Sequence, residues 1–139
     1  MEALVGLLDE GGYSCVIAQG DSVRCFSQRG VADLYALLRD EPQLLRGARV
    51  ADKVVGLGAA ALMLRGGVAV LYTHVISQGA LTLLEDGGVE VGYGALVPHI
   101  INRAGTGRCP LESRLDGACT LEEMLVRIDK FINEISNAK

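Results

Sequence analysis

The hydrophobic positions of this chain follow helical spacing in some stretches and strand spacing in others. Apolar residues recur at helical spacing in Met1–Asp9 and again after Gly30, and the second run ends before Pro42, because the residue before a proline avoids helical dihedral angles. Between these runs, residues 14–18 and 23–27 are short β-prone segments joined by a Gly-Asp turn. The pattern therefore predicts a helix, an antiparallel hairpin and a second helix.

The middle of the chain predicts two further strands that alternate with helices. A central helix is expected to run from Asp52, its N-cap, to Gly66-Gly67, and the unbroken apolar run 68–73 follows it as a strand. Ser77 is expected to cap the next helix, and residues 89–93 form another strand. A strand, helix, strand order implies a right-handed parallel crossover, and a strand that is apolar on both faces is usually covered by helices on both sides.

An irregular segment and a last helix follow. Residues 94–116 contain two prolines and few large apolar residues beyond Ile101. Thr120 begins a capping box that opens an amphipathic helix over about residues 120–137. The sequence shows no repeat and no linker, so residues 1–139 are predicted to form a single domain.

Composition narrows the classes of partner. The chain is 50% hydrophobic and 22% charged, as globular proteins are. Its net charge of −4 and its pI near 5.1 provide no basic surface for nucleic acid or for an anionic membrane. No apolar run is long enough to span a bilayer and no signal peptide is recognisable. We therefore expect a cytoplasmic protein without a nucleic-acid or membrane partner.

The four cysteines are expected to be free thiols. None of them forms a CxxC pair, and disulfides are rare in cytosolic chains. Cys15 and Cys25 lie in apolar strand patterns and are expected to fill the core. A zinc site needs three or four Cys, His or carboxylate ligands at suitable spacing, and the sequence offers none. We expect neither a metal nor another cofactor.

Two predicted helix starts carry polar residues that suit a ligand. Asp52 and Lys53 begin the central helix and Ser77 begins the next, and in a βαβ arrangement both N-termini lie at the carboxyl edge of the sheet. Such a crevice favours a phosphate, carboxylate or carbonyl oxygen, and Gly56 and Gly58 would let a ligand or the sheet come close. The alternative is that Asp52 and Ser77 are plain caps, that Lys53 is solvated, and that the glycines serve only tight packing.

The irregular segment adds a second group of candidates. Asn102 and Arg103 are expected to reach the same crevice. Cys109 is close in sequence to Arg103 and Arg108, which would lower the pKa of its thiol, so it is a candidate nucleophile with Glu112 or His99 to move a proton. The alternative is that Cys109, which precedes a proline, is a buried structural residue.

Four of these stretches together resemble a known family. Asp52-Lys53-Val54-Val55-Gly56, Val75–Ala80, Ile101-Asn102-Arg103 and Cys109–Glu112 are similar to the motifs of an uncharacterised prokaryotic family, domain of unknown function 1893, over about residues 13–115. The resemblance implies a three-layer α/β/α, cytidine-deaminase-like fold with a mixed sheet. Members of that family lack the zinc ligands of deaminases and have no established activity.

A comparison with zinc deaminases shows which groups are absent. Those enzymes carry H-x-E at one helix start and P-C-x-x-C at the next. Matched by position, Asp52 stands for the ligand histidine and Val54 for the glutamate, while Ser77 and Ala80 stand for the two cysteines. Without the metal and the carboxylate, zinc-dependent deamination is not expected.

The sequence leaves three hypotheses about function. The first is a protein that binds a small anionic or nucleotide-like ligand at the two helix starts. The second is a metal-independent enzyme that uses Cys109 as the nucleophile in sulfur or acyl transfer. The third is a structural or regulatory oligomer, and the apolar content of the chain also makes a homo-oligomer plausible under the first two.

Overall fold

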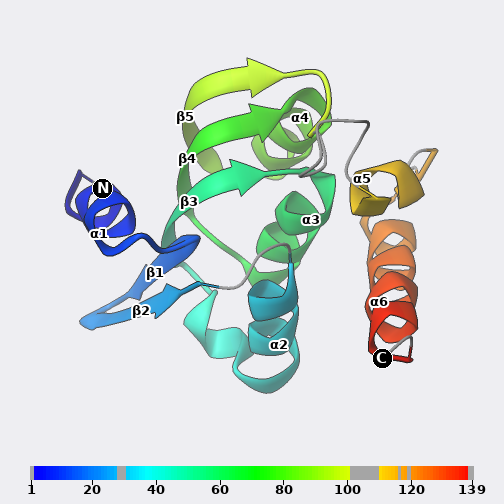
Figure 1. Cartoon of the computed structure of the whole chain (residues 1–139), viewed down its shortest axis with the longest axis horizontal. Coiled ribbons are helices and arrows are strands. Elements are labelled where there is room, and N and C mark those ends of the chain that lie inside the picture. The colour runs from blue at the N-terminus through cyan, green and yellow to red at the C-terminus, as the bar shows by residue number, and fades with distance from the viewer. Residues whose placement is uncertain (1, 28–30, 101–109, 116, 119, 138–139) are drawn as a thin grey trace.

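Figure 1 shows the computed structural model, which describes residues 2–27, 31–100, 110–115, 117–118 and 120–137. In chain order its elements are α1 (Glu2–Gly11), β1 (Cys15–Gln19), β2 (Ser22–Phe26), α2 (Ala32–Asp40), the 3-10 helix η1 (Pro42–Leu44), β3 (Arg49–Val55), α3 (Leu57–Gly66), β4 (Val70–Ser77), α4 (Gln78–Asp86), β5 (Glu90–Val97), α5 (Pro110–Arg114) and α6 (Leu121–Asn137).

The strands form one mixed sheet in the order β2-β1-β3-β4-β5. β1 pairs antiparallel with both β2 and β3. The β1–β2 pair is the hairpin that the sequence predicts. β3 pairs parallel with β4, and β4 pairs parallel with β5, with α3 and α4 as the two crossover helices. The expected α/β class with a mixed sheet is confirmed.

Alternating residues of β1 pack on opposite faces of the sheet. Cys15 and Ile17 belong to the larger hydrophobic cluster, to which α2, α3, α4 and α6 also contribute. Val16 and Ala18 belong to a smaller cluster with Leu4 and Leu8 of α1. Figure 1 accordingly places α1 on one side of the sheet and α3 on the other, with α6 beyond α3. The main core therefore lies between the sheet and α2–α4.

The start of the central helix differs from the sequence prediction. α3 begins at Leu57 with Gly56 as its N-cap, whereas Asp52 lies within β3, opposite Cys15 of β1 and Thr73 of β4. A residue between two strands forms backbone hydrogen bonds in the sheet, and this pairing outweighs the preference of aspartate for a helix start. The prediction that Asp52 caps the central helix is therefore wrong.

Other departures concern the ends of strands and the irregular segment. β4 continues to Ser77 and β5 to Val97, beyond the apolar runs that predicted them. A short helix, Pro110–Arg114, lies within the segment predicted to be irregular. Cys25 is exposed because β2 is an outer strand of the sheet, so the prediction that it fills the core is wrong. Among the helices that the structure describes, none has the length and apolar character to cross a bilayer.

Candidate functional site

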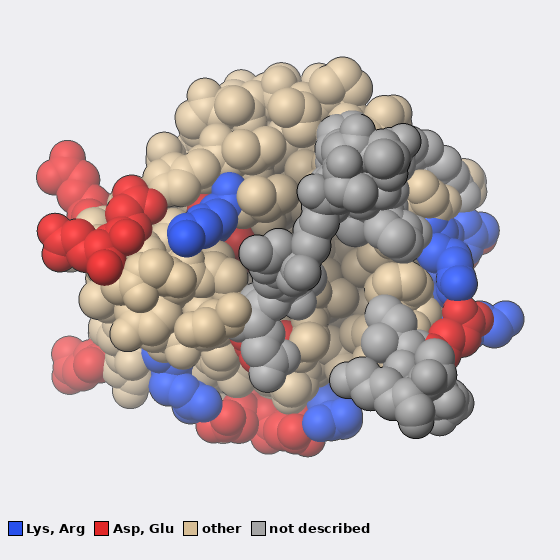
Figure 2. Space-filling model, viewed as in Figure 1, with Lys and Arg blue, Asp and Glu red and all other residues tan. Residues whose placement is uncertain are grey.

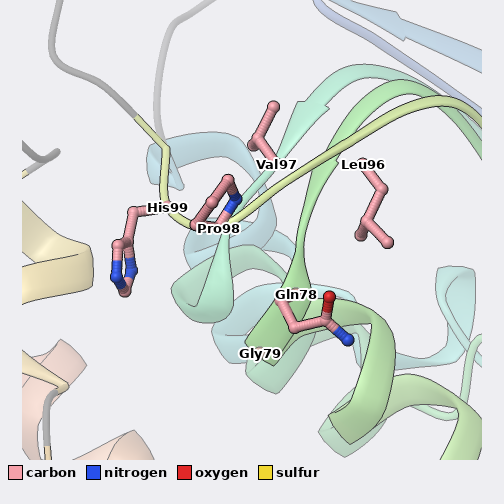
Figure 3. A pocket seen from close by; sticks show the side chains of 6 residues that line it. All are labelled: Gln78, Gly79, Leu96, Val97, Pro98 and His99. Carbon is pink, nitrogen blue, oxygen red and sulfur yellow. The ribbon is translucent and has the colours of Figure 1, made fainter.

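An open cavity of about 530 Å³ lies at the carboxyl edge of the parallel strands. Its described lining comes from the start of α4, with Gln78 and Gly79, and from the end of β5 and the residues after it, Leu96–His99. Figure 3 shows the side chains of Gln78 and Leu96 on the same side of the start of α4, with His99 beyond Pro98. Crevices at this edge of open α/β sheets are where ligands usually bind.

The local sequence explains why these two segments meet. Ser77 is the last residue of β4 and pairs with Val97 at the end of β5. It is also the N-cap of α4, since its buried hydroxyl oxygen accepts a hydrogen bond from the backbone N–H of Ala80 at 3.4 Å. Because no loop separates the strand from the helix, the first turn of α4 stands directly beside the end of β5. Ser77 therefore positions the cavity without lining it.

The cavity combines an apolar wall with two polar side chains. Leu96, Val97 and Pro98 provide the apolar part, and Leu96 is 41% exposed. The Gln78 amide can both donate and accept hydrogen bonds, and the His99 imidazole adds a second nitrogen-containing group. The six described lining residues include no charged carboxylate, lysine or arginine. This surface suits a ligand with an apolar ring and hydrogen-bonding groups at its edge.

The start of α3 does not contribute to this cavity. Leu111 of α5 packs so closely on Gly58 that a side chain at that position would clash with it. Gly56 has extended dihedral angles that any residue adopts, so its φ and ψ do not require glycine. The two helix starts were expected to open on one crevice, but the first turn of α3 is covered by α5.

Asp52 lies in a separate, buried group on the face of the sheet that carries the main core. Asp52 is 9% exposed, and its carboxylate accepts hydrogen bonds from the Val54 backbone N–H at 3.2 Å and from the Cys15 thiol. Burial raises the pKa of Asp52 to about 7, although these two hydrogen bonds act in the opposite direction. Burial also raises the pKa of the Cys15 thiol, and the nearby charges of Asp52 and Asp33 add to that effect. Asp52 therefore lies within the sheet and not among the described residues that line the cavity.

The other predicted residues are distributed as follows. Lys53 is exposed on β3, next in sequence to Asp52. Asn102, Arg103 and Cys109 lie outside the described residues, and so does the side chain of Glu112 in α5. The hypothesis of a Cys109 nucleophile therefore remains a prediction.

Sequence reasoning named His99 as a proton carrier but missed the rest of the cavity lining. The signal that could have found Gln78 was its position immediately after the predicted N-cap Ser77. Leu96 and Val97 were missed because the predicted strand ended at residue 93, whereas β5 continues to Val97. The length of β5 is set by its pairing with β4, which a local pattern does not show.

The geometry does not fit a deaminase zinc site. The first residues of α3 are Leu57 and Gly58, and α4 begins with Gln78 and Gly79, so neither helix start presents a His or Cys ligand. In the part of the chain that the structure describes, no group of three His, Cys, Asp or Glu side chains could hold a metal ion. Hydrolysis through a zinc-bound water is therefore not supported by these residues.

The sequence profile of the family described as Domain of unknown function (DUF1893) matches residues 3–132, which is most of the chain. The protein belongs to the DUF1893 family. A solved structure of another DUF1893 family protein, TM1506 from Thermotoga maritima, has a TM-score of 0.84 to this chain. It is 23% identical, and the match covers 96% of this chain and 88% of that one, so it shows a shared fold. No curated protein matches this DUF1893 chain.

Proposed function

We propose that this DUF1893 protein binds a small molecule with a planar polar ring, of the nucleobase, nucleoside or nucleotide type, in the cavity between α4 and β5. The observation that carries the proposal is the position of the cavity, at the carboxyl edge of parallel strands and beside the first turn of a helix. In this arrangement the ring lies against Leu96 and Pro98, and the Gln78 amide hydrogen-bonds to its polar edge.

The sequence resemblance supports the class of ligand. Zinc deaminases, whose fold the family is expected to share, bind a nucleobase through hydrogen bonds to its edge and contacts with its faces. An anionic group on the ligand would be favoured beside the first turn of α4, where backbone N–H groups and the helix dipole are positive. We propose binding without deamination, because the described residues do not fit a zinc site.

Calorimetric titration with a panel of nucleobases, nucleosides and nucleotides tests the proposal. Gln78→Ala is expected to weaken binding about tenfold, because one or two hydrogen bonds of about 1 kcal/mol each are lost. Gln43→Ala is the matched control, since Gln43 is an exposed glutamine of η1 outside the cavity lining. The proposal would be contradicted if no member of the panel binds, or if Gln78→Ala and Gln43→Ala weaken binding equally. Incubation with cytidine and zinc is expected to release no ammonia.

A further inference from the structure

The two edges of the sheet differ in how they are protected. β2, at one edge, has five residues and carries Arg24, whose guanidinium pairs with Glu41 at 3.4 Å and lies 5.9 Å from the ring centre of Phe26. β5, at the other edge, has eight residues, of which six are exposed, and Glu90 is its single charged residue. The longer edge is therefore the less protected one.

An unprotected edge strand favours pairing with another strand. Its outward backbone N–H and C=O groups are open to a second chain, and monomeric proteins usually guard such an edge with lysines, prolines, bulges or a covering element. β5 contains no lysine and no proline, and no described strand pairs with it on its outer side. Tyr93 is 42% exposed and Leu96 is 41% exposed. Figure 2, viewed as in Figure 1, shows the upper surface over β5 without charged side chains.

We propose that β5 pairs with β5 of a second copy of this chain, antiparallel and around a twofold axis, so that the two sheets become one. The position of Glu90 favours this direction. In an antiparallel pair centred near Tyr93 the two Glu90 residues are separated by about 20 Å along the strands, at about 3.3 Å per residue, whereas parallel pairing would place the two carboxylates side by side.

A second copy fits this edge better than a flexible peptide does. It supplies a strand of the same length, about 26 Å at 3.3 Å per residue, with the same distribution of charge. Its strand is already held in extended form by pairing with its own β4, so pairing requires little additional ordering, whereas a peptide would lose backbone entropy on binding. Tyr93, at the centre of the pair, would also be covered.

Sedimentation velocity over a range of concentrations tests the proposal. The natural chain is expected to sediment as a dimer of 14.7 kDa subunits. Tyr93→Lys is expected to raise the dimer dissociation constant about tenfold or more, because two like charges would face each other and an aromatic contact would be lost. Val23→Lys is the matched control: Val23 is 49% exposed on β2, the opposite edge. A natural chain that stays monomeric, or a Tyr93→Lys variant that dimerises like the natural chain, would overturn the proposal.

Hydrogen exchange of the natural chain gives a second test that needs no variant. The outward amides of β5 are expected to exchange more slowly as protein concentration rises, while those of β2 are expected to exchange at a constant rate. Concentration-dependent protection of β2 instead of β5, or none in either strand, would contradict the β5 pairing. Tyr93 and β2 lie outside the described cavity lining, so failure of the dimer leaves the ligand proposal to its own test.

Discussion

Replacing Asp52 by asparagine is expected to make the protein more stable at neutral pH relative to the natural chain. The carboxylate lies in β3, almost fully buried, and its hydrogen-bond donors are the Val54 backbone N–H and the Cys15 thiol. Asparagine has nearly the same shape and keeps an oxygen that can accept both hydrogen bonds, but it carries no charge. The substitution therefore isolates the effect of ionising a buried group.

The sign and size follow from the two pKa values. Burial raises the pKa of Asp52 from 3.8, its ordinary value, to about 7 in the folded protein. Between these values the folded protein holds a proton that the unfolded chain has lost, so its free energy of unfolding falls as the pH rises. The contribution of Asp52 to the free energy of unfolding is fully present below about pH 4 and is lost as the pH rises through about 7. At about 1.4 kcal/mol per pH unit the loss is about 4 kcal/mol.

Urea denaturation of both chains at several pH values measures this effect. The free energy of unfolding of Asp52→Asn minus that of the natural chain is expected to increase from pH 4 to pH 7 and then to level off. Asp21→Asn, which removes an exposed carboxyl group in the hairpin turn, is the control. A difference for Asp52→Asn that is the same at pH 4 and pH 7 would refute the argument.

Two further predictions concern packing and thiol reactivity. Gly66→Ala is expected to lower the free energy of unfolding by about 1–3 kcal/mol, because its Cβ would lie 2.7 Å from Cδ1 of buried Leu45. Gly6→Ala places the alanine Cβ in open space on α1 and is expected to raise the free energy of unfolding by about 0.5–1 kcal/mol. Urea denaturation shows whether each variant is less or more stable than the natural chain. Exposed Cys25 is expected to react with a maleimide in the folded protein, whereas Cys15, which is buried and has a raised thiol pKa, is expected to react only after unfolding. Peptide mapping by mass spectrometry identifies the labelled cysteine, and labelling of Cys15 before Cys25 would contradict the prediction.

The parts of the fold that depend on local chemistry could be predicted from the sequence. The β1–β2 hairpin follows from two β-prone runs and a Gly-Asp turn. Ser77 caps α4 as expected, and the Thr120 hydroxyl oxygen accepts a hydrogen bond from the Glu123 backbone N–H at 3.1 Å, as the predicted capping box requires. In each case the residues that decide the structure are close together in the sequence.

The environment of Asp52 could not be predicted in this way. Aspartate, lysine and then a glycine and alanine run are typical of a helix start, but the decisive neighbours are Cys15 on β1 and Thr73 on β4, both distant in sequence. The burial pattern of β3 also lacks alternation, because Val50, Ala51 and Asp52 are all buried and the next two residues, Lys53 and Val54, are both exposed. A strand with two consecutive exposed residues does not show the two-residue period by which strands are recognised.

β5 connects the proposed ligand site with the proposed dimer. Leu96 and Val97 line the cavity, and the same strand forms the edge that would pair with a second copy. Pairing would fix the backbone of β5 up to the cavity wall, so a ligand in contact with that wall should bind the dimer and the monomer with different affinities. Thermodynamic linkage then requires each bound ligand to change the dimer dissociation constant by the same factor. Equal ligand affinity of monomer and dimer would show that the end of β5 is already held in place by β4 and α4 within one chain.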